Sequence, residues 1–86
     1  MKNRNKGEII DMNNEIYHSV VIARKTTDDL TKGGIYYIKS VSENLNYVIT
    51  NEIGSKIELD SIGSDDFVVL FNVTTSEINK IRNIII

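Results

Sequence analysis

Two pairs of adjacent aspartates are the residues of this chain whose type and spacing could do chemistry. Asp28–Asp29 and Asp65–Asp66 each supply the two carboxyl groups that paired general acid and base catalysis uses. However, the side chains of adjacent residues on an extended chain point apart. Aspartate close to glycine or serine is moreover a turn former first. We therefore expect both pairs to lie in loops as separate carboxylates and not as a catalytic dyad.

Nucleophilic catalysis has a single candidate base, His18, which is the only histidine in the sequence. No carboxylate partner or second metal ligand stands at a recognisable spacing from it, so we interpret His18 as a strand residue near the surface. The sequence also lacks a glycine-rich phosphate loop that opens a helix. We therefore expect a protein that is not an enzyme and that carries neither a cofactor nor a metal.

Length and charge restrict the function further. Eighty-six residues predict one domain with a small core, and the absence of cysteine excludes disulfides and thiolate metal sites. The net charge of −2, with both signs mixed, does not give the basic face of a general nucleic-acid binder. No apolar run approaches the roughly 20 residues of a membrane span, and no apolar segment follows Lys2, Arg4 and Lys6 as in a signal peptide. We expect a cytoplasmic protein.

Short segments of β-branched and aromatic residues, separated by turn residues, predict a mainly β fold. The expected strands are residues 17–25, 35–41, 47–53, 56–59 and 67–71. In the second of these, alternation places Tyr36 and Ile38 in the core and leaves Tyr37 exposed. The expected core residues are Leu30, Tyr36, Ile38, Ile57, Leu59 and Phe67.

The C-terminus predicts a short helix. Thr74 and Glu77 have the spacing of a capping box, and Ile78, Ile81 and Ile85 then share one face, opposite Asn79 and Arg82. A helix of about ten residues is unstable alone in water, so it must dock. It can dock on the last strand, which is apolar on both faces, or on a second chain. A weak homodimer through Ile84, Ile85 and Ile86 is the corresponding expectation.

The segment from Asp29 to Tyr36, with sequence Asp-Leu-Thr-Lys-Gly-Gly-Ile-Tyr, is followed by a Tyr-Val-Ile strand and an Asn-Glu-Ile-Gly turn. Together with Phe67 before the last strand, this pattern resembles a group of very small SH3-like proteins from phages and prophages of low-GC Gram-positive bacteria. The resemblance implies a small SH3-like five-stranded antiparallel barrel with a short C-terminal helix. We expect a flexible arm over residues 1–14, the barrel over 15–73 and the helix over 74–86.

Two functions of different classes agree with this pattern. The first is a phage-type interaction module that binds a host protein and modulates it, with inhibition as the expected effect. Tyrosine favours interface centres and charge steers association. The expected partner contacts are therefore Asp28, Asp29, Tyr37, Tyr47, Asp65 and Asp66. The alternative is a nucleic-acid-binding barrel in which Tyr37 or Tyr47 stacks on bases. Its expected phosphate contacts are Lys2, Arg4, Lys6, Arg24 and Lys25.

Overall fold

The structure, a computed structural model, describes residues 16–60 and 65–86. The elements in chain order are β1 (His18–Ala23), β2 (Ile35–Tyr37), β3 (Ser40–Val41), β4 (Tyr47–Thr50), β5 (Lys56–Leu59), β6 (Phe67–Val73) and α1 (Thr75–Ile85). The protein is thus a mainly β domain with a C-terminal helix, as the sequence predicts. The predicted arm over residues 1–14 lies outside the described residues.

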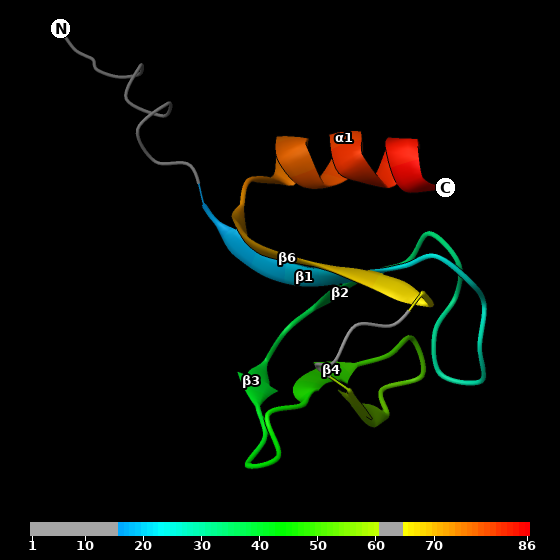
Figure 1. Cartoon of the computed structure of the whole chain (residues 1–86), viewed down its shortest axis with the longest axis vertical. Coiled ribbons are helices and arrows are strands. Elements are labelled where there is room, and N and C mark those ends of the chain that lie inside the picture. Colours follow the sequence, from blue (N-terminus) through cyan, green and yellow to red (C-terminus); the bar gives the residue numbers. More distant parts are fainter. Residues whose placement is uncertain (1–15, 61–64) are drawn as a thin grey trace, which may run out of the picture.

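The strands form two open antiparallel sheets (Figure 1). The first, sheet A, has the order β2-β1-β6, and the second, sheet B, has the order β3-β4-β5. The predicted strand 35–41 is divided between them. The backbone amide of Ile38 donates to Ser19 of β1, whereas that of Lys39 donates to Val48 of β4. The chain therefore changes its pairing partner between these two residues, and the expected count of five strands becomes six.

The two sheets do not close into a hydrogen-bonded barrel within the described residues. They are joined on one side by the segment 35–41, which pairs first with β1 and then with β4. On the other side, β5 and β6 end their sheets without pairing to each other over the described residues. The expectation of a closed five-stranded barrel is corrected to two open sheets that share one crossing segment.

The main core lies between the sheets. Val21 and Ala23 of β1 are fully buried there with Ile49 of β4, and their small β-branched or apolar side chains fit a strand covered on that face. Of the expected core residues, Leu30 and Tyr36 are buried. The other four are half-buried and pack against this core: Ile38, Ile57, Leu59 and Phe67.

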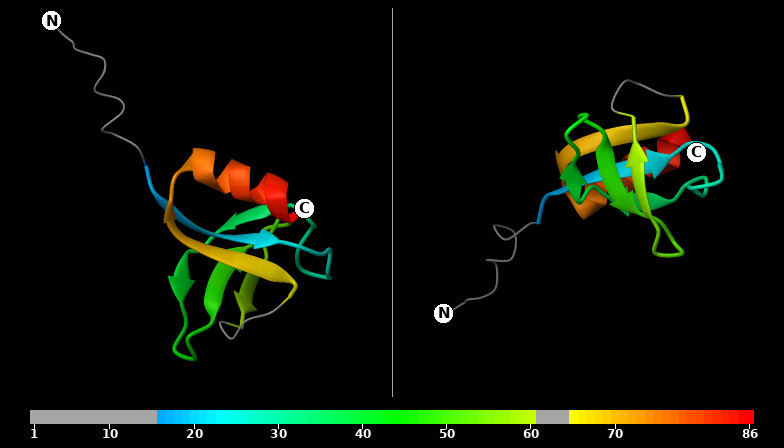
Figure 2. Two further views of the ribbon diagram at one scale, coloured as in Figure 1. Left: turned by 45° about the horizontal axis from the view of Figure 1, so that its top comes forward. Right: turned by 90° about the horizontal axis from the view of Figure 1, so that it is seen from below.

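Helix α1 covers the other face of sheet A, so that the middle of β1 is buried on both faces and β6 is half-buried over most of its length (Figures 1 and 2). Its predicted capping box is present: the Glu77 amide donates to the Thr74 hydroxyl, and the Glu77 carboxylate accepts from the Thr74 amide. Ile78 is 2% exposed and packs with Val20 and Ile22 of β1. The predicted C-terminal helix is present, and of the two docking alternatives the structure shows packing on sheet A of the same chain.

Strand β6 is longer than predicted and contains a β-bulge. Val20 pairs with Leu70 and His18 pairs with Val73, so that Phe71 and Asn72 together lie opposite Ser19. The Asn72 amide donates to the Ser19 hydroxyl at 3.4 Å, and Asn72 has a φ of 53°. A bulge re-aims the side chains beside it. In this strand, Phe71 is left 54% exposed although its neighbour Leu70 packs beneath the helix.

Candidate protein-interaction surface

The Tyr36 hydroxyl fixes the acidic loop between β1 and β2. It accepts a hydrogen bond from the Thr31 amide at 2.8 Å and donates one to the Glu52 carboxylate at 2.5 Å. These bonds join three segments, namely the loop, β2 and the turn after β4. Burial and the adjacent Glu52 carboxylate raise the pKa of the Tyr36 phenol, while the hydrogen bond from Tyr36 lowers the pKa of Glu52. These hydrogen bonds position the loop, and the Tyr36 hydroxyl already has both a donor and an acceptor partner within the chain.

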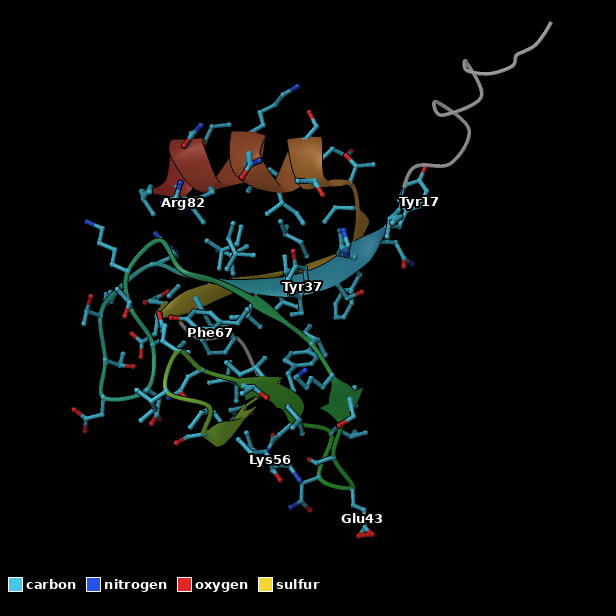
Figure 3. The ribbon with its side chains drawn as sticks, turned by 180° about the vertical axis from the view of Figure 1, so that it is seen from behind. Tyr17, Tyr37, Glu43, Lys56, Phe67 and Arg82 are labelled. Carbon is cyan, nitrogen blue, oxygen red and sulfur yellow. The ribbon has the colours of Figure 1, made fainter. Side chains whose placement is uncertain are left out.

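The glycine pair before β2 is explained by two close contacts. Gly33 has a φ of 81°, and its carbonyl accepts a hydrogen bond of 2.6 Å from Arg82 Nε of the helix. A Cβ atom on Gly34 would lie 2.6 Å from the Tyr36 hydroxyl oxygen. Gly33 thus supplies a left-handed turn and Gly34 leaves room for the tyrosine ring. The prediction that Arg82 lies opposite the apolar helix face is wrong, because Arg82 is half-buried against this loop (Figure 3).

Asp28 and Asp29 lie exposed at the tip of that loop. The Thr27 hydroxyl accepts hydrogen bonds from the amides of Asp29 and Leu30, and Leu30 is buried as predicted. The Asp29 carbonyl accepts a hydrogen bond from the Asn51 side chain. Hydrogen bonds from the Thr27 and Asn51 side chains to the loop backbone therefore hold the loop, while Asp28 and Asp29 remain exposed as separate charges.

Asp65 and Asp66 lie directly before β6. The Asp66 carbonyl accepts a hydrogen bond from the Arg24 amide, and its carboxylate is 3.7 Å from Lys25 Nζ. Both of these charged side chains are about half-exposed or more, so the ion pair adds little stability. The pair of aspartates is thus placed beside two basic residues at the end of β1.

Two pairs of aromatic rings lie on the surface at the other end of β1. The Tyr37 ring, 54% exposed, is tilted against His18 with centroids 5.2 Å apart. Tyr47 is half-buried and is tilted against the exposed Phe71, with centroids 5.8 Å apart. Tyr17, immediately before β1, adds a further exposed ring (Figure 3). The exposure of Tyr37 was predicted from alternation and is confirmed.

The six predicted contact residues therefore do not gather at one place. The aspartates lie at the loop tip and beside Arg24, while the tyrosines belong to β2 and β4 near the ring pairs. Sequence reasoning missed His18 and Phe71 as members of these two ring pairs. No sequence pattern indicates the exposure of Phe71, because β6 is apolar at nearly every position and only the bulge turns this ring outward.

No family model matches the chain, and neither the curated proteins nor the solved structures give a significant match. Across residues 16–60 and 65–86, no three histidine or acidic side chains come together as metal ligands would. Within the same residues, the single helix is too short to cross a membrane.

The Tyr36–Glu52 hydrogen bond predicts a pH dependence of stability. The native pKa of Glu52 is lowered, so its stabilising contribution is present above the ordinary glutamate pKa and is lost as the pH falls through the native value. The native pKa of Tyr36 is raised, so its contribution is present below the ordinary tyrosine pKa and is lost as the pH rises through the native value.

Chemical unfolding across pH tests this pair. We expect Tyr36→Phe to reduce the fall in unfolding free energy below about pH 4.3, the ordinary glutamate pKa. Glu77, whose pKa is lowered by the Thr74 amide, contributes in the same direction and is removed separately by Glu77→Gln. If Tyr36→Phe and the unmodified protein have the same acid dependence, the hydrogen bond does not stabilise the fold.

Proposed function

We propose that this chain is a small protein-interaction module built on an open SH3-like barrel, which binds a host protein and inhibits it. The observation that carries the proposal is the group of aromatic rings at the His18 end of β1: the His18–Tyr37 pair on the helix side of sheet A, the Tyr47–Phe71 pair on the side of sheet B, and Tyr17 just before the strand. Tyrosine and phenylalanine are enriched at protein interfaces, where a rigid ring buries a large area at little entropic cost. Exposed aromatic rings that gather on a small domain mark a site of protein–protein interaction, where a partner covers them.

The strand pairing supports the proposed similarity to SH3-like barrels. If residues 35–41 are counted as one bent strand, the pairing order becomes β6, β1, the bent strand, β4 and β5. This is a five-stranded meander with its first and last strands paired, which is the layout of a small barrel. Fold alone does not define a function, so the host-protein partner rests on the aromatic rings at this end of β1 and on the resemblance to phage proteins.

Nucleic-acid binding has less support from the described residues. Lys25 is close to Asp66, and both Arg24 and Lys25 lie beyond the end of β1, whereas Tyr47 lies in the second sheet. A single-strand binding groove needs its cations along the track of the stacked bases. Lys2, Arg4 and Lys6 lie outside the described residues.

Affinity capture from a low-GC Gram-positive lysate, with tagged protein and mass spectrometry, tests the proposal. We expect one host protein to be retained in stoichiometric amount by the unmodified chain and to be lost with Tyr37→Ala. The control is Ile53→Ala, which changes an exposed residue in the turn between β4 and β5. Salt-sensitive binding of labelled oligonucleotides, with no protein captured, would contradict the proposal and favour the alternative.

A further inference from the structure

The last turn of α1 lies over Gly33, at the end of the loop between β1 and β2 (Figure 3). A Cβ atom on Gly33 would lie 3.3 Å from both Arg82 Nη2 and Ile86 Cδ1. Gly33 is buried, so its carbonyl needs a hydrogen-bond donor. Arg82 Nε is that donor at 2.6 Å, and no other donor to this carbonyl occurs in residues 16–60 or 65–86. The end of the helix therefore completes the hydrogen bonding of the loop.

The same glycine also joins the loop to β1. The Gly33 amide donates to the Ala23 carbonyl at 2.8 Å, and the Ala23 amide donates to the Gly34 carbonyl at 3.0 Å. Next to them, the Lys32 amide donates to the Thr26 hydroxyl at 3.0 Å and closes the neck of the loop. Gly33 is thus held between β1 on one side and the helix end on the other, and a shift of Gly33 would open the neck.

The neck determines how the exposed aspartates at the loop tip are presented. Asp28 and Asp29 lie within the segment that the neck closes, and both are exposed. A loop that is already fixed in the free protein loses less conformational entropy when a partner binds it. A side chain that fixes the neck therefore affects partner affinity without touching the partner.

We propose that Arg82 is a positioning residue for the partner contact at Asp28 and Asp29, and that the helix end and the loop neck order each other through Gly33. The effect on partner binding rests on the proposed function, whereas the mutual ordering is a property of the free chain. Coupling between two sites is reciprocal. Loss of the Arg82 guanidinium thus loosens the loop neck, and a distorted Gly33 loosens the last turn of the helix.

Two matched methionine variants test the first direction by amide hydrogen exchange. Arg82→Met and Lys80→Met each remove one positive charge from α1 and keep an unbranched stem, but Lys80 is exposed. We expect Arg82→Met to speed exchange of the Lys32 and Gly33 amides at least about tenfold relative to the buried Ile49 amide, which reports global unfolding. Lys80→Met should leave this ratio unchanged. Equal ratios in the two variants would overturn the proposal.

Two matched alanine variants test the reverse direction. Gly33 and Gly54 have φ angles of 81° and 84°, so alanine strains the backbone similarly at both positions. A Cβ atom on Gly54 would have nothing within 4 Å. We expect Gly33→Ala to speed exchange of the Ile86 amide, which donates to the Arg82 carbonyl, at least about fivefold. Gly54→Ala should not change it. Identical exchange of this amide in both variants would contradict the reciprocal coupling.

Affinity for the host protein that the unmodified chain retains from the lysate tests the positioning role. We expect Arg82→Met to weaken binding at least about threefold and Lys80→Met to leave it unchanged, with both variants folded by circular dichroism. Equal affinities of the two variants would overturn the positioning role. Capture of no protein by the unmodified chain would contradict the proposed function and with it the role of Arg82 in binding, while the exchange ratios would still support or overturn the coupling within the chain.

Discussion

Truncation after Val73, which removes α1, is expected to lower the unfolding free energy by at least about 3 kcal/mol. Burial of one isoleucine such as Ile78 is worth about 1.5–3 kcal/mol. In addition, Val20 and Ile22, fully buried beneath the helix, would become exposed. For a domain of this size, such a loss lowers the melting temperature by roughly 10 °C or more, and circular dichroism or calorimetry measures it. Reduced solubility is expected for the same reason.

Point variants separate packing from simple loss of chain length. Ile78→Ala should reproduce much of the loss, about 2–5 kcal/mol for a buried isoleucine. Asn79→Ala, at the exposed neighbour on the same helix, should change the unfolding free energy by less than about 0.5 kcal/mol. A truncated protein that remains soluble, monomeric and equally heat-stable would show that the helix does not stabilise sheet A.

Replacing Ile49 by alanine is the second change with a large expected effect, a loss of about 2–5 kcal/mol. Ile49 is 0% exposed between the two sheets, where it packs with Val21 and Leu30. The cost arises from lost burial and from the cavity left behind, which a small core cannot readily close. Urea unfolding monitored by circular dichroism measures the change.

Phe67→Ala provides the comparison within the same core. The sequence alone predicts a full core position for Phe67, but the ring is half-buried at the border of the sheets (Figure 3). We therefore expect a smaller loss, about 2 kcal/mol, because the site can refill with water or neighbouring side chains. A larger loss at Phe67 than at Ile49 would contradict the placement of the core around β1 and β4.

Local patterns predicted much of this fold. Alternation identified Tyr36 as buried and Tyr37 as exposed, and the capping box identified the start of the helix. The isolated Leu30 in a polar loop was recognised as a core residue, and it is buried. These features depend on residues within one turn or one strand of each other, so local sequence patterns are sufficient to predict them.

Features that depend on distant partners were not predictable. The division of 35–41 arises because Ile38 bonds to β1 and Lys39 to β4, and neither bond has a local signature. Arg82 was placed opposite the apolar helix face, although its spacing of four residues from Ile78 puts it on the same side. Its guanidinium donates to a carbonyl 49 residues away, a contact that no local pattern indicates. Phe71 became part of the candidate surface through a bulge opposite Ser19. The tertiary contacts decided each of these cases.

The affinity of the captured host protein for single alanine variants tests the central claim most directly. We expect Tyr37→Ala to weaken binding at least about tenfold, the equivalent of roughly 1.4 kcal/mol, with little change in melting temperature. Alanine at Asp28, Asp29, Asp65 or Asp66 should alter mainly the association rate and its salt dependence. Tyr47→Ala should weaken binding as Tyr37→Ala does. Undiminished binding with all six positions changed to alanine would contradict the assignment of the partner surface.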